Sequence, residues 1–193
     1  MGAPFVFGGD HFVTWLHAAS INFRTSPHEL QIHPCAHPTP SSKLPRMSIR
    51  DARAQDIPAL ETLARDLPTA AHWTPAQYHD LFTETPRIVW LIEEDNIVVA
   101  FLVARSSGSD WEIENLAVAE ARQRCGLATE LLRALITRAA GSGATSIFLE
   151  VRASNLPAQR FYQAHAFREA GRRPNYYSSP GEDAIVLRRD PNV

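Results

Sequence analysis

The chain has 193 residues, a formal net charge of −2 and a sequence pI of about 6.4. This near-neutral balance excludes a protein whose main partner is bulk nucleic acid or an anionic membrane surface. No apolar run approaches the ~18–20 residues needed to cross a bilayer, and the N-terminus has no basic segment followed by an apolar one. We therefore expect a cytoplasmic protein, and its hydrophobic content of 45% is enough for a full core.

Residues 1–46 differ in composition from the rest of the chain. They contain six of the 14 prolines and five of the eight histidines, and no sustained period of 2 or 3.6 runs through them. Two interpretations stay open: a poorly ordered N-terminal extension, or a non-native segment upstream of a true start at Met47. Under both interpretations residues 47–193 form the folded domain.

The cysteines are few and far apart in the sequence. Cys35 lies in a proline-rich stretch and Cys125 in a turn, and we expect both to be free thiols in a reducing compartment. The tract His33-Pro-Cys35-Ala-His37 has the residue types of metal ligands, but no second ligand pair accompanies it. We therefore predict no metal site.

Two apolar periods alternate along residues 48–189. A period of 2 or a short apolar run predicts strands over Ser48–Ala54, Arg87–Glu93, Ile97–Arg105, Trp111–Ala119, Ser146–Arg152, Ala166–Arg172 and Asp183–Arg189. A period of 3.6 predicts a helix capped by Asp56, one after the Thr74-Pro75-Ala76-Gln77 capping box, one from Gly126 to about Ala140, and one capped by Ser154 or Asn155. The strand–helix–strand run over 111–152 implies a right-handed parallel crossover, so the fold is α/β with a mixed sheet covered by helices on both faces.

The turn Gln123-Arg124-Cys125-Gly126-Leu127-Ala128 is the sharpest motif. The first turn of a helix has free N–H groups and a partial positive charge, which suit a pyrophosphate. Gly126 lets the backbone approach a ligand closely, and Arg122 and Arg124 add charge. A glycine before a helix is often only a turn, but the position of this one between two strands favours a phosphate site.

Several segments of the chain, taken together, resemble the Gcn5-related N-acetyltransferase (GNAT) superfamily. They are Glu114-Asn-Leu-Ala-Val118, the turn at Gly126, Phe148-Leu-Glu-Val-Arg-Ala-Ser-Asn155, and Phe161-Tyr162 with Phe167. Within the superfamily, Leu149-Glu150-Val151-Arg152 and the tail Arg172-Arg-Pro-Asn-Tyr-Tyr177 are similar to the ribosomal-protein-alanine N-acetyltransferases (RimI type). The resemblance covers Met47 to Arg189. Ala128 stands where glycine is common, and Pro174 interrupts the Arg-Arg-Asn-Tyr-Tyr run.

This resemblance implies a mixed, mostly antiparallel central sheet with a V-shaped splay between two parallel strands, and an acetyl-CoA-dependent N-acetyltransferase. The implied acceptor is the N-terminal α-amino group of a protein, with a ribosomal protein that starts with alanine as one candidate. A small-molecule amine, a lysine side chain, or a non-catalytic acetyl-CoA sensor are the alternatives. No nucleic acid, membrane or metal is implied, and we expect a monomer or weak dimer. The implied cofactor-binding residues are Leu116, Ala117, Val118, Gln123, Arg124, Cys125, Gly126, Leu127, Ala128, Thr129, Asn155 and Tyr162.

Two carboxylates compete for the role of general base. An α-amino group has a pKa of about 7.7–8, so only about one in ten is neutral at pH 7 and a carboxylate can take its proton. Glu150 is the first candidate, because its strand neighbour Phe148 offers an apolar surface that raises a carboxyl pKa. The alternative is that Glu150 only forms an ion pair, and Glu114 is then the base.

Some of the remaining candidate site residues also have a structural interpretation. The resemblance implies that Tyr162 gives a proton to the departing CoA thiolate, although an aromatic on a short helix is usually a packing residue. Asn155 either bonds the pantetheine arm or caps a helix. Tyr176 and Tyr177 are expected in a loop that lines the acceptor cleft. The full set of implied substrate-binding residues is Trp73, Glu114, Arg173, Tyr176 and Tyr177.

Overall fold

The structure is a computed structural model that describes residues 48–67, 71, 73–83, 87–178 and 180–193. Its strands are β1 (Ile49–Asp51), β2 (Arg87–Glu94), β3 (Ile97–Ser107), β4 (Asp110–Val118), β5 (Ser146–Arg152), β6 (Arg168–Ser178) and β7 (Gly181–Arg189). Its helices are α1 (Ile57–Arg65), α2 (Pro75–Asp80), α3 (Leu127–Gly141) and α4 (Leu156–Ala164), with 3-10 turns at Ala54–Asp56 and Glu120–Arg122. The predicted extension and the tract around Cys35 lie outside the described residues.

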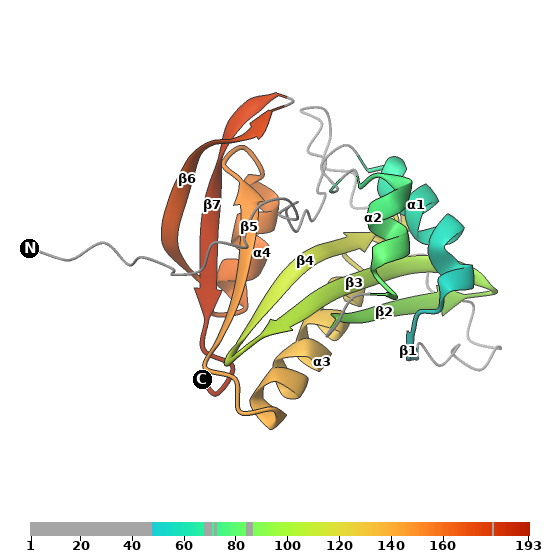
Figure 1. Ribbon diagram of the computed structural model, residues 1–193, viewed down its shortest axis with the longest axis horizontal. Helices are drawn as coiled ribbons and strands as arrows, with labels where there is room; N and C mark the ends of the chain where they lie inside the picture. Colours follow the sequence, from blue (N-terminus) through green and yellow to red (C-terminus); the bar gives the residue numbers. More distant parts are fainter. Residues whose placement is uncertain (1–47, 68–70, 72, 84–86, 179) are drawn as a thin grey trace, which may run out of the picture.

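The described strands form one seven-stranded sheet in the order β1-β2-β3-β4-β5-β7-β6. Every neighbouring pair is antiparallel except β4 and β5, which are parallel and are joined through α3. Helices α1 and α2 cover one face of the sheet and α3 covers the other (Figure 1). The predicted α/β class with a mixed, mostly antiparallel sheet is therefore confirmed.

The helices on both faces of the sheet are amphipathic and turn their apolar sides toward it. The sheet therefore has one apolar core on each face. On the first face, the stripe Leu127, Leu131, Leu132, Leu135 and Ala139 of α3 packs with Ala158 and Tyr162 of α4. On the second face, Leu60, Leu63 and Ala64 of α1 pack with Tyr78 of α2 and with Val89, Leu91, Phe101 and Val103 of the sheet. We call these the α3 face and the α1 face.

The C-terminal hairpin differs from the prediction. Strand β6 ends at Ser178, so Tyr176 and Tyr177 lie on a strand and the expectation of a loop is wrong. Pro174 fits because β6 is an edge strand and because the register of β6 on β7 shifts between Arg173 and Tyr177, where β6 holds extra residues. Pro174 interrupts the Arg-Arg-Asn-Tyr-Tyr run as noted from the sequence, and the structure places it in a bulge inside a strand.

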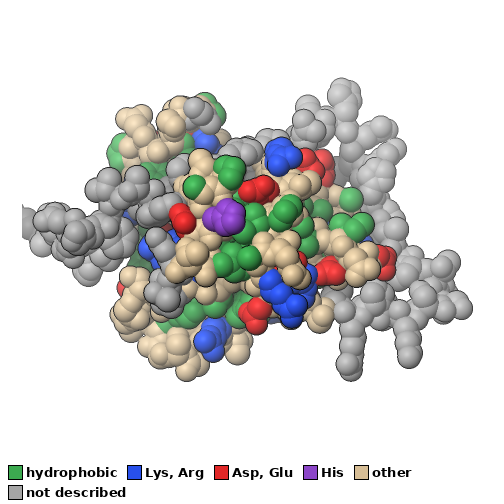
Figure 2. All heavy atoms as spheres, turned by 45° about the vertical axis from the view of Figure 1, so that its right-hand side comes forward, with side chains coloured by type: hydrophobic (Ala, Val, Ile, Leu, Met, Phe, Trp, Pro, Cys, Tyr) green, Lys and Arg blue, Asp and Glu red, His purple; other side chains and the backbone are tan. Residues whose placement is uncertain are grey.

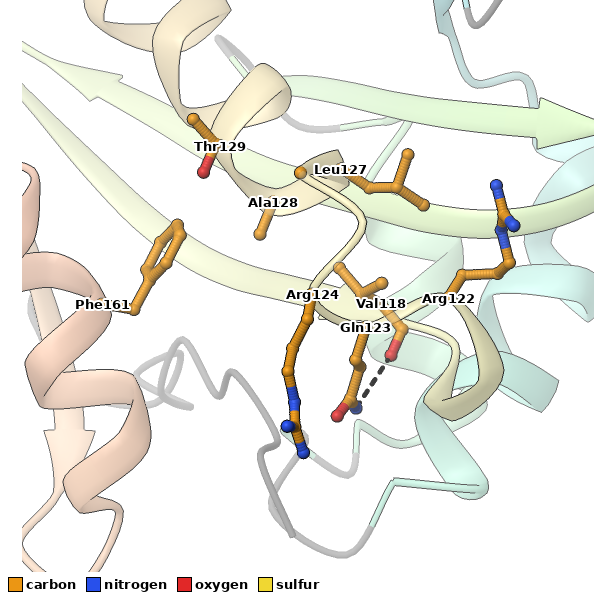
Figure 3. A pocket seen from close by; sticks show the side chains of 9 residues that line it. Val118, Arg122, Gln123, Arg124, Leu127, Ala128, Thr129 and Phe161 are labelled. Atoms are coloured by element: carbon orange, nitrogen blue, oxygen red, sulfur yellow. Dashed lines mark hydrogen bonds between the residues drawn. The ribbon is translucent and has the colours of Figure 1, made fainter. Parts of the chain in front are cut away.

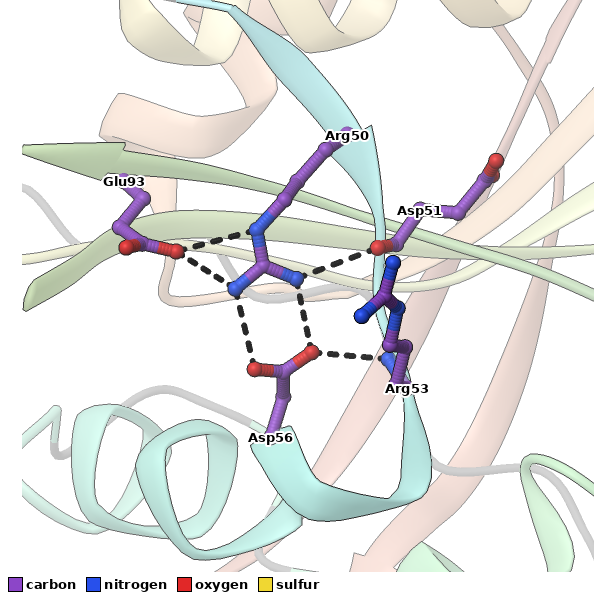
Figure 4. Close-up of polar contacts among 5 residues, drawn as sticks. All are labelled: Arg50, Asp51, Arg53, Asp56 and Glu93. Atoms are coloured by element: carbon purple, nitrogen blue, oxygen red, sulfur yellow. Dashed lines mark hydrogen bonds and ion pairs between the residues drawn. The ribbon is translucent and has the colours of Figure 1, made fainter. Parts of the chain in front are cut away.

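The start of α1 also differs in detail. Asp56 precedes α1 as predicted, but its side chain makes no capping hydrogen bond to that helix. The carboxylate instead accepts from Arg50 Nη1 and Nη2 at 2.8 and 3.0 Å, and from the Arg53 N–H at 2.8 Å (Figure 4). Arg50 also binds Glu93 on β2, so this cluster ties β1 and the start of α1 to the sheet.

The surface carries both signs of charge. On the face in Figure 2, acidic and basic side chains of the described residues are interspersed rather than gathered by sign. Among the described helices, none has the length and apolar content to cross a membrane.

Candidate active site

Strands β4 and β5 separate in the middle of the sheet. Their parallel pairing ends at Ile113 and Leu149, although β4 continues to Val118 and β5 to Arg152. The register of β4 on β3 shifts at the same level, so Glu114 lies in a bulge. Beyond this level one edge of β4 is open, which is the predicted V-shaped splay.

Backbone groups of β4 face this open edge. The Ala119 N–H donates to the Val99 carbonyl at 2.8 Å, toward β3. Hydrogen-bonding direction alternates along a strand, so the N–H groups of Leu116 and Val118 point to the open edge and that of Ala117 points to β3. The open edge thus includes Leu116 and Val118 of the predicted cofactor-binding residues, but not the Ala117 amide.

A cavity of about 200 Å³ lies where β4 ends and α3 begins (Figure 3). Its lining residues are Val118, Arg122, Gln123, Arg124, Gly126, Leu127, Ala128, Thr129 and Phe161. Gly126 has a φ of 86°, in the left-handed region that favours glycine, and among the described residues no atom lies within 4 Å of the position a Cβ would take. The backbone of the turn, rather than close packing, therefore requires the glycine. Gln123 Nε2 donates to the Val118 carbonyl at 3.3 Å and ties the turn to β4.

The chemistry of this cavity fits a diphosphate. The first N–H groups of α3 are not bonded within the helix, and the helix dipole adds partial positive charge there. Arg122 Nη2 donates to Glu94 at 2.6 Å, so the charge of Arg122 is compensated, whereas Arg124 is exposed. The lining residues include two arginines and no carboxylate.

Glu150 stands on β5 directly after the last residue paired with β4. Leu149 points into the core on the α3 face, so Glu150 points to the α1 face. The Arg173 Nε lies 2.7 Å from Glu150 Oε1, and the Tyr176 hydroxyl also hydrogen-bonds the carboxylate. Glu150 is only 6% exposed, and its Oε2 has no hydrogen-bond partner among the described residues. Burial raises the pKa of Glu150, although Tyr176 and Arg173 oppose the rise.

Glu114 is held differently. Arg87 Nε lies 2.7 Å from Oε2, Arg87 Nη2 donates to Oε1 at 3.2 Å, and Arg105 Nε lies 3.5 Å from Oε1. Burial raises the pKa of Glu114, and the hydrogen bonds from Arg87 oppose the rise. Both carboxylate oxygens are thus engaged by arginines, so the geometry favours Glu150 over Glu114 as a base.

Tyr162 lies in the core on the α3 face. It is 0% exposed, and its ring makes edge contacts with Phe161 and Phe167, each at 5.3 Å between centroids. Its hydroxyl has no hydrogen-bond partner in the described part of the chain, and burial raises its pKa, so the phenol stays protonated. The cavity is lined by the neighbouring Phe161 and not by Tyr162.

The structure places Asn155 as a helix cap. Its Oδ1 accepts from the Ala158 N–H at 3.2 Å at the start of α4, and the residue is 5% exposed. The capping interpretation is therefore confirmed, while contact with a pantetheine arm stays a prediction.

The structure separates the predicted substrate-binding residues into groups. Arg173 and Tyr176 of β6 reach Glu150, but Tyr177 is buried beneath the Arg152 guanidinium, whose Cζ lies 4.0 Å from the ring centroid. Trp73 is half-buried before α2 and makes an edge contact with Tyr78 at 5.4 Å between centroids. Trp73 and Tyr177 thus serve packing in this structure.

Sequence reasoning missed two features of the site. Phe161 lines the cavity, although only its partner Tyr162 was singled out. Asn115 is 0% exposed, and neither its amide nitrogen nor its amide oxygen has a hydrogen-bond partner among the described residues. The sequence does show a polar residue, Asn115, inside an otherwise apolar strand. That feature could have indicated a functional residue, but Asn115 was included only as part of the Glu114–Val118 motif.

Cys125 corrects a further expectation. It is half-buried in the turn and disulfide-bonded, so the expectation of a free thiol is wrong at this position. Within the described ranges no group of histidine, cysteine and carboxylate side chains is arranged to hold a metal ion.

Comparisons with known proteins agree with this geometry. The model of the acetyltransferase (GNAT) family matches residues 55–167. A ribosomal protein bS18-alanine N-acetyltransferase of Haemophilus ducreyi is 38% identical over 98 residues, which cover 49% of this chain and 67% of that protein. An uncharacterized N-acetyltransferase of Methanocaldococcus jannaschii is 30% identical over 149 residues, which cover 76% and 94%. The crystal structure of the ribosomal-protein-S18-alanine N-acetyltransferase from Escherichia coli superposes with a TM-score of 0.67 at 27% identity, over 74% of this chain and 92% of that one.

Proposed function

Because the chain belongs to the acetyltransferase (GNAT) family and is an acyltransferase, we propose that it transfers an acetyl group from acetyl-CoA to the N-terminal α-amino group of a protein. The proposed acceptor is a ribosomal protein that starts with alanine, since the relatives from Haemophilus ducreyi and Escherichia coli are named for such an acceptor. The observation that carries the proposal is the position of the buried Glu150 at the level where β4 and β5 part. A cytoplasmic location follows from the proposed acceptor.

Acetyl-CoA supplies the acetyl group as a thioester. The turn Gln123–Thr129 would hold its diphosphate, because free N–H groups and Arg124 meet there. The N–H groups of Leu116 and Val118 on the open edge of β4 would bond the pantetheine arm. The Val118 N–H also suits polarisation of the thioester carbonyl, since it is fixed in the strand before the reaction begins.

Glu150 is the proposed general base. It takes a proton from the acceptor ammonium: an N–H bond breaks and the carboxylate becomes a carboxylic acid. The freed amine attacks the thioester carbonyl, a C–N bond forms, the C–S bond breaks, and the nitrogen loses a second proton to become the amide as the thiolate leaves. The raised pKa supports this role, because it brings the carboxylate closer to the amine in proton affinity. Glu114 is proposed to organise the sheet through Arg87 rather than to exchange protons.

Tyr162 is the proposed proton donor to the leaving thiolate. One observation supports it: no described residue accepts a hydrogen bond from its hydroxyl. A buried hydroxyl without a partner is unfavourable by about 1–3 kcal/mol, which a bound sulfur atom would relieve.

The test offers the protein acetyl-CoA with three kinds of acceptor. The first is an alanine-starting peptide, the second is the same peptide N-terminally blocked but with a lysine, and the third is a panel of small amines. We expect acetylation of the first alone. Acetylation confined to the blocked peptide would assign lysine side chains, acetylation confined to the small amines would assign those, and binding of acetyl-CoA without turnover on any acceptor would leave a sensor.

A further inference from the structure

Both oxygens of the Glu150 carboxylate are closed to an incoming amine. Oε1 is held by the Arg173 Nε at 2.7 Å and Oε2 is buried. A base must come within hydrogen-bond distance of the proton that it takes. One of the groups that cover Glu150 must therefore move before the proposed reaction begins.

Arg173 is the most exposed of these covering groups. Its side chain is 48% exposed, whereas that of Glu150 is 7% exposed. An arginine that swings away from Glu150 into water stays fully solvated, so its departure costs little beyond the loss of a half-exposed ion pair. Tyr176 is half-buried, and its ring lies below the Arg173 guanidinium at 5.6 Å from Cζ.

The bulge in β6 brings Arg173 and Tyr176 to the same carboxylate. Residues three apart point to opposite faces of a regular strand, so the two side chains could not both reach Glu150. Between Arg173 and Tyr177 the register shifts, and Asn175 has a φ of 52° with its N–H bonded to Asp183 Oδ1 at 2.9 Å. The extra residues in β6 re-aim the strand toward Glu150.

We propose that Arg173 is a positioning residue that covers Glu150 until the acceptor's α-ammonium group displaces its guanidinium. The inference rests on the proposed function, because it assumes that a cationic amine is the acceptor. One cation replaces another at the same carboxylate. The buried carboxylate is therefore not left without a positive partner during the exchange, and a neutral ligand lacks this compensation.

The charged and titratable groups that face Glu150 define the expected pH dependence. Arg173 favours the carboxylate form, and Glu112 on β4 disfavours it while itself bound to Arg105 at 2.8 Å. Tyr176 and Tyr177 have raised pKa values and stay protonated. Removal of Arg173 consequently raises the pKa at which Glu150 loses its proton.

The experiment compares Arg173→Ala with Arg172→Ala in the full chain. Arg172 is the matched control, since it is exposed and binds Glu169 instead of Glu150. For Arg173→Ala we expect the KM of the alanine-starting peptide to fall about 3- to 10-fold, because no guanidinium has to be displaced. The acidic limb of the kcat/KM profile should move up by about one pH unit. Arg173→Lys should restore part of both effects, and Arg172→Ala should match the wild type.

A rise in KM with an unmoved acidic limb would overturn the proposal and make Arg173 a direct acceptor contact. Unchanged values of both would also overturn it. The titration of the Glu150 carboxyl by NMR, in wild type and Arg173→Ala without acceptor, separates this inference from the proposed function. If the wild type acetylates no peptide, the proposed function fails, and an unshifted Glu150 titration would independently refute the role of Arg173.

Discussion

Replacement of Glu150 by glutamine tests the proposed base most directly. Glutamine has nearly the same shape and keeps an oxygen that accepts from Tyr176, so the hairpin contact persists. The change removes the negative partner of Arg173, but that side chain is half-exposed and is readily solvated. We therefore expect the unfolding midpoint to change little and the chemistry to change greatly.

The size of the loss follows from the proton that has to be removed. About nine in ten α-amino groups are charged at pH 7, and a positioned base contributes roughly 10²–10⁴ in rate, or about 3–5 kcal/mol. Glu150→Gln should lower kcat by that factor while the affinity for acetyl-CoA stays unchanged, since the cavity at α3 is untouched. The remaining activity should rise with pH up to the pKa of the amine, because the peptide then arrives already neutral.

A steady-state assay from pH 5 to 10 gives kcat and its pH dependence. Calorimetry gives the affinity for acetyl-CoA. Turnover within threefold of the wild type, with its pH profile preserved, would refute Glu150 as the base. An equal loss of acetyl-CoA affinity and of kcat would point instead to a disturbed fold.

Three further variants test other parts of the site and the fold. Glu114→Gln should destabilise the protein by about 3–5 kcal/mol, because the buried Arg87 guanidinium, 6% exposed, loses the negative charge that compensates it; a denaturant midpoint like that of the wild type would contradict the structural role. Tyr162→Phe should slow the chemical step without weakening acetyl-CoA binding or stability, and an unaltered rate and pH profile would reduce Tyr162 to packing. Asp56→Asn should cost about 1 kcal/mol at pH 7, since Arg50 is partly exposed and solvent screens the pair. The hydrogen bonds from Arg50 lower the pKa of Asp56 below its ordinary value of 3.8. The difference in unfolding free energy between wild type and variant should therefore be full above pH 3.8 and vanish as the pH falls through the pKa of Asp56 in the folded protein. A difference that persists in acid would exclude the ion pair as its cause.

The sequence predicted those parts of the fold that depend on local patterns. The strand Ser146–Arg152 was predicted to the residue, and α3 ends one residue beyond its predicted end, because period and glycine signals are strong there. The bulge at Glu114 and the bulge around Pro174 could not be predicted. Both depend on how a strand pairs with a distant neighbour, and a single sequence does not reveal register.

In the candidate site too, features set by local sequence could be predicted, and features set by strand pairing could not. The turn at Gly126 was predicted because its positive φ requires glycine, and a glycine is visible in the sequence. The arginines that bind Glu114 and Glu150 were not predicted as partners, since Arg87 is 27 residues from Glu114 and Arg173 belongs to another hairpin. Ion pairs across a sheet are products of topology rather than of local spacing.

The bulge that holds Pro174 has a consequence for association between molecules. Strand β6 forms one edge of the sheet, and an edge strand normally presents a regular row of N–H and C=O groups to which another chain can add. Pro174 has no N–H to offer, and the irregular backbone around it interrupts that row. The opposite edge, β1, is only three residues long. Both edges of this sheet therefore resist strand-by-strand growth into aggregates.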